Sequence, residues 1–362
     1  MARALLGGVR MLTRLASLLL LSTSLLACTG DDGAATGDDD GSAAHCTEAS
    51  SMMSMPIDQI ANPSGGTQVA QWQLLAPMSA SSVLAYAPDA AGAQRIAVLD
   101  ANGAQDVASI AGGANYYLRA AKVGDCALLS AKNGLGLACP GQPYEVAGQD
   151  FDTSGSDPLF AVQSGSDIIA FTQSYAAFTQ ITRSGPGQWS QQEQYESSIS
   201  FPTDALLANG APVACFIDEA DHAVVAYGAG RVRSTAKAQW CKLAVSGDML
   251  TVVTNIGTVT QPLSSFAADG VLALAGAVPA MDGAPVRLVT LDGGAAAIEK
   301  KSSAIAVTPL DGSAGKLIPT LGNSTLDVTG NALTVVSTTT DSTSTQSGTQ
   351  YSQTVLFETH CL

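Results

Sequence analysis

Charged and aromatic residues are scarce in this sequence, at 13% and 5% of the chain. Few charges argue against a mainly helical protein, because exposed helix faces are normally covered by Lys, Arg, Asp and Glu. Basic residues are the scarcer kind, with 16 Lys and Arg against 31 Asp and Glu and a net charge of −15. Nucleic-acid binding needs a basic surface that displaces counterions from phosphates. We therefore expect no nucleic-acid partner.

Apolar residues nevertheless make up 46% of the 362 residues, enough for the core of one large domain or two ordinary ones. The 36 Gly, together with abundant Ser and Thr, favour strands and turns over helices. The composition therefore predicts an all-β protein.

Long hydrophobic runs are also missing. The apolar run from Leu15 to Ala27 covers about 13 residues, whereas a bilayer of ~30 Å needs about 20. Arg3, Arg10 and Arg14 precede the run and supply the positive segment of a secretory signal. Residues 1–27 are therefore predicted to be a signal peptide rather than a membrane span.

Leu25-Leu26-Ala27-Cys28 resembles the lipobox of bacterial lipoproteins, with Leu26 where a small residue is more usual. The resemblance covers the signal segment only, and it implies cleavage before Cys28, lipidation of Cys28 and anchoring in the cell envelope. Thr29, where Asp would imply inner-membrane retention, implies the outer membrane, facing the periplasm or the cell surface. An ordinary secretory signal with a chance cysteine is the alternative.

Residues 28–45 contain Gly, Ala, Ser, Thr and Asp and no large apolar residue, which is typical of a flexible tether. The Asp-rich segment lacks the alternating ligand spacing of a calcium loop. The folded domain is expected to span residues 46–362.

Six cysteines remain after Cys28, an even number that predicts disulfides in an oxidising compartment. Zinc is the competing interpretation, but no CxxC spacing occurs and only three His are present. Six cysteines allow fifteen pairings, and locality favours one set: two Cys facing each other across a hairpin, two on neighbouring strands of one sheet, and two at the ends of the fold. These pairs are Cys126–Cys139, Cys215–Cys241 and Cys46–Cys361.

One phrase recurs in the chain: VSGDMLTVVT at 245–254 and VTGNALTVVS at 328–337. Each copy places a turn Gly before a β-branched run and so predicts the opening of a hairpin. Weaker copies centre on Gly124 and Gly165, and the spacing indicates a unit of about 41 residues.

Units of this length with several short strands are typical of β-propeller blades. The length predicts seven blades, with six or eight as alternatives, closed where the termini meet by Cys46–Cys361. A two-domain β-sandwich is the main alternative.

No motif for catalysis, metal binding or cofactor binding is found. We therefore expect no catalytic residue, metal or cofactor. Asp218, Glu219, Asp221 and His222 form the most polar cluster, and an exposed turn explains it better than a site. His360 and the methionines at 52, 53 and 55 are weaker candidates.

Three functions stay open. The first is a binding or scaffold propeller with an envelope protein or glycan as partner. The second is a hydrolase or lyase acting on a polysaccharide at the channel. The third is a propeller that binds calcium or a small ligand.

Overall fold

In the computed structural model, residues 46–362 form one compact unit built almost wholly of β-strands. Cys28 and the predicted signal peptide and tether lie outside the described residues. Among the residues that are described, the only helix is the short 3-10 element η1 (Leu263–Phe266), and no helix could span a membrane. The structure describes residues 46–61, 65–110, 118–131, 134–147, 160–174, 177–195, 201–278, 281, 283–291, 294–346 and 348–362.

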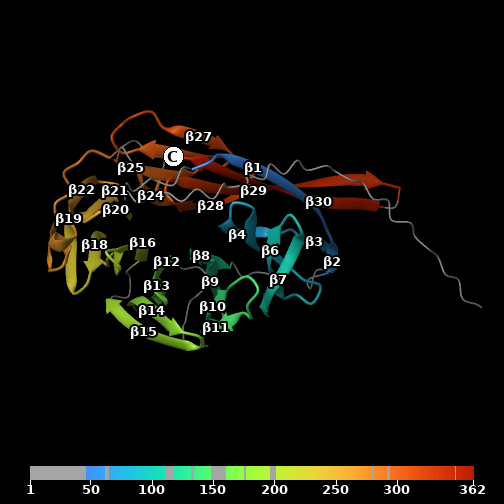
Figure 1. The fold of residues 1–362 in the computed structure, drawn as a ribbon, viewed down its shortest axis with the longest axis horizontal. Helices are drawn as coiled ribbons and strands as arrows, with labels where there is room; N and C mark the ends of the chain where they lie inside the picture. The colour runs from blue at the N-terminus through green and yellow to red at the C-terminus, as the bar shows by residue number, and fades with distance from the viewer. Residues whose placement is uncertain are drawn as a thin grey trace, which may run out of the picture. The chain divides into compact units, whose positions relative to one another are not determined.

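Seven separate sheets of three to five strands make up this unit, and they form the seven blades of a β-propeller. Figure 1 shows the first strand of each blade nearest the middle of the ring and the later strands further out. The predicted seven-bladed propeller is confirmed, and the two-domain sandwich is wrong.

Blades 1 to 3 are four-stranded antiparallel sheets in which each strand pairs with the next in sequence. From inner to outer edge, their strands are β4 (Gln73–Ser79), β5 (Ser82–Pro88), β6 (Gln94–Asp100) and β7 (Gly103–Ile110) in blade 1; β8 (Arg119–Val123), β9 (Cys126–Ala131), β10 (Gly134–Ala138) and β11 (Glu145–Val146) in blade 2; and β12 (Phe160–Ser164), β13 (Asp167–Ser174), β14 (Ala177–Gly185) and β15 (Gln188–Tyr195) in blade 3.

Blades 4 to 7 vary this plan: blade 4 gains a parallel fifth strand, blade 5 keeps three strands, and blade 7 takes its outer strand from the N-terminus. Their strands are β16 (Phe201–Ala208), β17 (Ala211–Ile217), β18 (His222–Tyr227), β19 (Gly230–Lys237) and β23 (Gly270–Leu272) in blade 4; β20 (Cys241–Ser246), β21 (Met249–Thr254) and β22 (Gly257–Pro262) in blade 5; β24 (Arg287–Leu291), β25 (Gly294–Lys300), β26 (Ala304–Pro309) and β27 (Lys316–Pro319) in blade 6; and β28 (Asn323–Thr329), β29 (Ala332–Thr345), β30 (Gly348–Cys361) and β1 (Ala49–Ile57) in blade 7.

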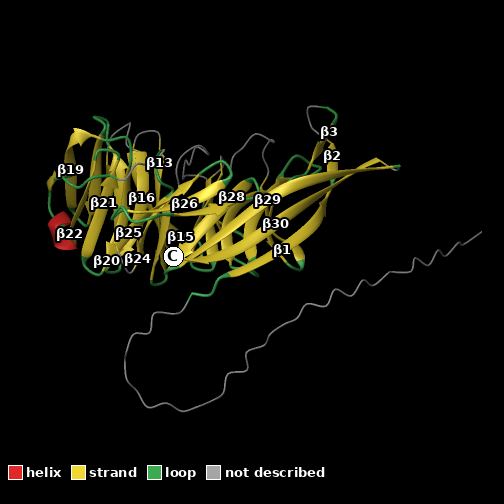
Figure 2. Ribbon diagram, turned by 90° about the horizontal axis from the view of Figure 1, so that it is seen from above, coloured by secondary structure: helices red, strands yellow, loops and turns green. Residues whose placement is uncertain are grey.

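Two further strands and a long hairpin complete the fold. β2 (Gln59–Ala61) and β3 (Thr67–Val69) form a small separate hairpin. β29 and β30 pair with each other over 14 residues, whereas β28 reaches only Thr338 and β1 only Tyr351. Their hairpin therefore continues past its neighbours, as Figure 2 shows.

The hydrophobic core is divided among the blade interfaces. Seven clusters of buried side chains occur among the described residues, one between each pair of neighbouring blades. Between blades 7 and 1, Met55 and Phe357 pack with Trp72 and Val83. A blade in a closed ring buries both of its faces, which explains why a sequence with so few charged residues folds in this way.

The repeated phrase marks the same turn in successive blades, the one between the inner and second strands. Gly124, Gly165, Gly210, Gly247 and Gly330 all occupy these turns with φ between 57° and 75°. Gly is favoured there because it adopts positive φ without steric cost. The predicted unit of 41 residues is an average, since neighbouring turns lie between 37 and 45 residues apart where both are described.

The structure contains the three disulfides Cys46–Cys361, Cys126–Cys139 and Cys215–Cys241. Cys46–Cys361 joins the ends of the fold as predicted. The predicted placement of Cys215 and Cys241 in one sheet is wrong. Cys215 lies on β17 of blade 4 and Cys241 begins β20, the inner strand of blade 5. Over the 26 residues that separate them, the chain therefore passes from one blade into the next.

Candidate functional site: the central channel

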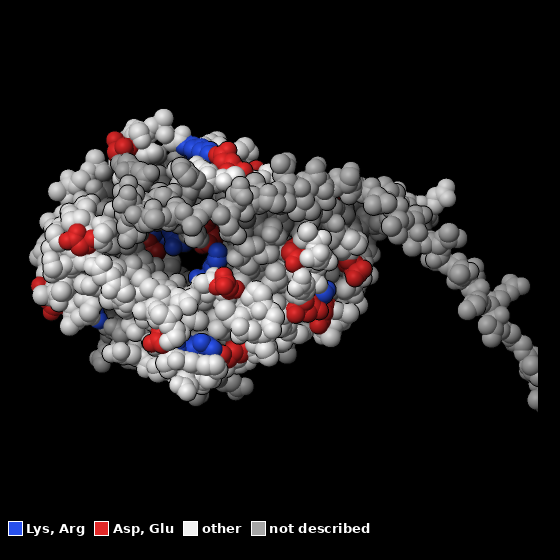
Figure 3. All heavy atoms as spheres, in the orientation of Figure 1, with Lys and Arg blue, Asp and Glu red and all other residues white. Residues whose placement is uncertain are grey.

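A cavity of about 780 Å³ lies at the middle of the ring and is lined by residues of all seven inner strands, β4, β8, β12, β16, β20, β24 and β28. Figure 3 shows it as a hollow with both basic and acidic atoms in its wall. Each inner strand pairs on one side only, with the second strand of its own blade. Its other edge presents backbone N–H and C=O groups toward the channel.

Side chains from neighbouring blades satisfy part of this free edge. The Thr290 hydroxyl of blade 6 donates to the carbonyl oxygen of Val245 in blade 5, at 2.8 Å. The Thr325 hydroxyl of blade 7 donates to the carbonyl oxygen of Leu75 in blade 1, at 3.0 Å. Bonds of this kind tie the blades together around the channel.

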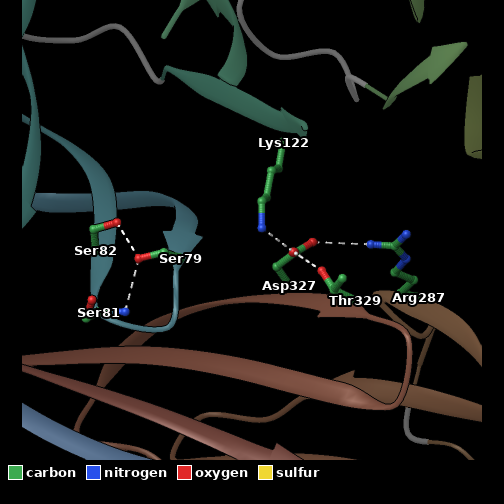
Figure 4. A network of polar contacts seen from close by, with 7 residues as sticks. All are labelled: Ser79, Ser81, Ser82, Lys122, Arg287, Asp327 and Thr329. Carbon is green, nitrogen blue, oxygen red and sulfur yellow. Dashed lines mark hydrogen bonds and ion pairs between the residues drawn. The ribbon is translucent and has the colours of Figure 1, made fainter. Parts of the chain in front are cut away.

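Asp327 is the centre of a charged network in the channel wall. Its carboxylate accepts from Lys122 Nζ at 2.8 Å and from Arg287 Nη1 at 3.4 Å, so it joins side chains of blades 2, 6 and 7. The Thr329 hydroxyl also donates to it, at 3.3 Å. Figure 4 shows the two cations approaching Asp327 from different strands.

The three charged groups of this network differ in exposure. Lys122 and Asp327 keep 23% and 13% of their side-chain surface, whereas Arg287 keeps 49%. Arg287 reaches Asp327 only through a long bond, although a guanidinium carries five N–H donors. Its side chain is therefore more available to a ligand than that of Lys122.

A second charged pair, Asp204 and Lys242, is buried beside the cavity. One carboxylate oxygen of Asp204 accepts from the Leu243 backbone N–H at 2.8 Å. Lys242 Nζ donates to the Thr203 carbonyl at 2.5 Å and lies 5.3 Å from the Phe160 ring centroid. Burial raises the pKa of Asp204 even though Lys242 opposes this shift, and burial lowers the pKa of Lys242.

The polar cluster singled out in the sequence forms the turn between β17 and β18, not part of the channel. One oxygen of the buried Asp218 carboxylate accepts from the backbone N–H groups of Ala220 and His222, both at 2.9 Å. Its other oxygen pairs with Arg233 Nη2 at 2.6 Å. Asp221 pairs with Lys237 at 2.9 Å. The carboxylates therefore stabilise a turn, as predicted, although the Asp218 side chain is buried and not exposed.

The other candidates also lie away from the channel. His360 Nε2 is 4.0 Å from Glu358 on the same strand, β30. Met55 is buried between blades 7 and 1, whereas Met52 is 70% exposed on β1. Among the described residues, no group of three His, Cys, Asp or Glu side chains gathers in a way that could hold a metal ion.

Sequence motifs missed the channel residues because these come from different blades. Lys122 and Asp327 are 205 residues apart and touch only in the closed ring. The signal that could have found them is the repeat itself, since each precedes a turn glycine, Gly124 or Gly330, by two or three residues.

Comparison with known proteins gives matches in structure only: no family model matches, and no curated protein matches. The Dos1 propeller is similar over 82% of this chain and 81% of its own, at 12% identity and a TM-score of 0.48. A gluconolactonase from Xanthomonas campestris is similar over 64% and 82%, at 16% identity and a TM-score of 0.41. The SapL1 lectin, solved with alpha methyl fucoside, is similar over 68% and 95%, at 12% identity and a TM-score of 0.41.

Proposed function

We propose that this protein is a binding propeller anchored by lipid in the outer membrane of a bacterial envelope, and that its central channel is the ligand site. The observation that carries the proposal is the cavity of about 780 Å³ into which charged side chains of several blades converge. Its volume falls in the range of about 300–1,000 Å³ that is usual for ligand pockets.

The charged groups in the cavity wall favour a role in ligand binding over a role in stabilising the fold. An ion pair at the surface contributes little to stability, whereas a cation kept partly exposed in a cavity is available to a ligand. The three disulfides agree with an oxidising, extracytoplasmic location. An envelope glycan or an envelope protein is the proposed partner.

The channel is tested with a variant that fills it. Ala121, on β8, lines the cavity, and Ala121→Trp is expected to block it. Thermal unfolding is measured with and without small saccharides released from the cell's own envelope polysaccharides. Wild type is expected to melt at a higher temperature with its ligand, because a ligand that binds only the native state stabilises it by mass action.

Ser313→Trp, in the exposed turn between β26 and β27, is the matched control and should retain the shift. Equal shifts in wild type and Ala121→Trp would overturn the channel as the site. If no saccharide shifts wild type, crosslinked capture from native membranes decides between an envelope protein as partner and no partner.

The anchor is tested separately with Cys28→Ser. The wild-type protein is expected to carry the mass of acyl chains and to sediment with membranes. The variant should lose both properties, because a propeller without acyl chains has no buried CH₂ groups to hold it there. A variant that still sediments with membranes would contradict lipid anchoring through Cys28.

One observation favours a hydrolase or lyase as the second candidate. Asp204 lines the cavity and burial raises its pKa, a property found in general acids. Release of reducing ends from an envelope polysaccharide, lost in Asp204→Asn while saccharide binding persists, would support catalysis. The bonds that Asp204 already accepts make binding the first choice.

A further inference from the structure

The charge of the channel is opposite to that of the protein. Among the described residues that line the cavity, three cations stand against two acids. The whole chain holds 16 Lys and Arg against 31 Asp and Glu. Low-dielectric walls focus the field of such a cluster, so the cavity attracts anions that the rest of the surface repels. The charged lining residues are Lys122, Arg287, Lys300, Asp204 and Asp327.

The five charged lining residues carry a net charge of one positive charge, and desolvation acts in opposite directions on the pKa of one cation and one acid among them. Burial lowers the pKa of Lys300 and raises that of Asp204, so it favours the neutral form of both. The loss of one positive and one negative charge leaves the balance unchanged. Lys122 and Arg287 then exceed Asp327 by one charge.

Strand register repeats a charged residue at one position of several inner strands. Each inner strand pairs with the second strand of its blade up to the turn between them. On four inner strands, a charged residue lies four positions before the last paired residue. Three of the four residues are cationic, and among these three Arg287 is the one that lines the cavity. These residues are Arg119, Asp204, Lys242 and Arg287.

Arg287 has the geometry for a carboxylate. Its planar fork matches the two oxygens of a carboxylate, and nearly half of its side chain is exposed in the cavity. Lys122, held by the other oxygen of Asp327, adds a second cation from a different blade. A single carboxylate balances the net charge of the site.

The rest of the wall suits hydroxyl groups. The inner edges of the strands present backbone donors and acceptors, and hydroxyl side chains bond to the carbonyl oxygens of Val245 and Leu75 there. A ligand with several hydroxyls can bond to backbone groups of this kind in the same way.

Resting on the proposed function, we infer that the channel binds a saccharide that carries one carboxylate, with the carboxylate on Arg287 and Lys122. The probes are galacturonate and glucuronate, and each has its neutral methyl ester as the matched control. Titration calorimetry at low salt is expected to show each acid binding at least ten-fold more tightly than its ester. Affinity for the acid should fall as salt rises, whereas affinity for the ester should not.

Arg287→Gln is expected to weaken binding of the acid by about 10- to 100-fold and to leave the ester unchanged, since it removes a charge-assisted bond worth ~1.5–3 kcal/mol. Arg287→Lys, which keeps the charge without the fork, should fall between the two. Arg95→Gln is the control, because Arg95 pairs with Asp106 on blade 1 and does not line the cavity.

The two proposals fail differently. Acids and esters that bind equally, in a way that Ala121→Trp abolishes, would overturn the carboxylate and keep the channel. Acid binding that Arg287→Gln leaves intact would also overturn the assignment. If neither acid binds, the carboxylate inference is overturned, and the envelope saccharides then test the channel alone.

Discussion

Glu145 shows how one side chain can join two blades. It lies on β11 of blade 2, and its carboxylate accepts from Arg183 at 3.0 and 2.7 Å, from the Gly187 backbone N–H at 2.9 Å and from Trp189 Nε1 at 2.8 Å. These three partners all belong to blade 3 or its last turn. The bonds to Arg183 are the main cause that lowers the pKa of Glu145 to about 2.

Glu145→Gln should lower the free energy of unfolding at pH 7 by about 1–3 kcal/mol, because the Arg183 charge loses its partner. A lowered carboxyl pKa stabilises the fold above the unfolded value, and this stabilisation is lost as pH falls toward the folded value. The difference between wild type and variant should therefore shrink between pH 4.5 and about 2. Urea unfolding at several pH values measures it.

Glu48→Gln is the matched control, since Glu48 forms an exposed pair with Lys316. Such pairs contribute little, so its unfolding curve should match that of wild type. A pH-independent loss of stability in Glu145→Gln would show that packing, not charge, joins these blades.

At the scale of elements, β1 closes the ring. It pairs with β30 at nine positions and so completes blade 7 from the opposite end of the chain. Gln353, fully buried on β30, accepts from the Trp72 backbone N–H at 2.9 Å and donates to the Trp72 carbonyl at 2.8 Å. The strand that ends the chain therefore fixes the entry into blade 1.

A chain that begins at Asp58 lacks β1 and the buried side chains of Met55 and Ile57, each of which typically contributes about 2–5 kcal/mol relative to Ala. We expect its melting temperature to fall by more than 10 °C, and a synthetic peptide of residues 46–57 to restore part of the loss. Differential scanning calorimetry measures both. An unchanged melting temperature would show that the ring closes without β1.

At the scale of the whole molecule, Cys46–Cys361 spans 315 residues and Cys126–Cys139 only 13. In the chain-entropy model, these links restrict the unfolded chain and so stabilise the fold by up to about 5–6 and 3 kcal/mol, respectively. Cys46→Ser with Cys361→Ser should therefore lower the melting temperature more than Cys126→Ser with Cys139→Ser. The first double variant keeps β1, so it also distinguishes the stability contributed by the disulfide from the stability contributed by the strand. The reverse order would contradict the loop-length argument.

Much of this protein could be predicted from its residues alone. Few charges, many glycines and a repeated turn before LTVV predict strands, blades and a ring, because these features act through local backbone preference and period. The pairing of Cys46 with Cys361 was the one left after locality paired the other four cysteines, and it predicted that the two ends of the fold meet. The export signal and Cys28 remain predictions, since they lie outside the described residues.

Only the tertiary structure brings the channel together. Lys122, Arg287 and Asp327 come from three blades, and nothing in their local sequence distinguishes them from surface charges. Cys215 and Cys241 likewise bridge two blades, although their spacing suited one sheet. The physical reason is the same in both cases: periodicity along a chain determines which residues face a neighbouring blade, whereas closure of the ring determines which residues meet across it.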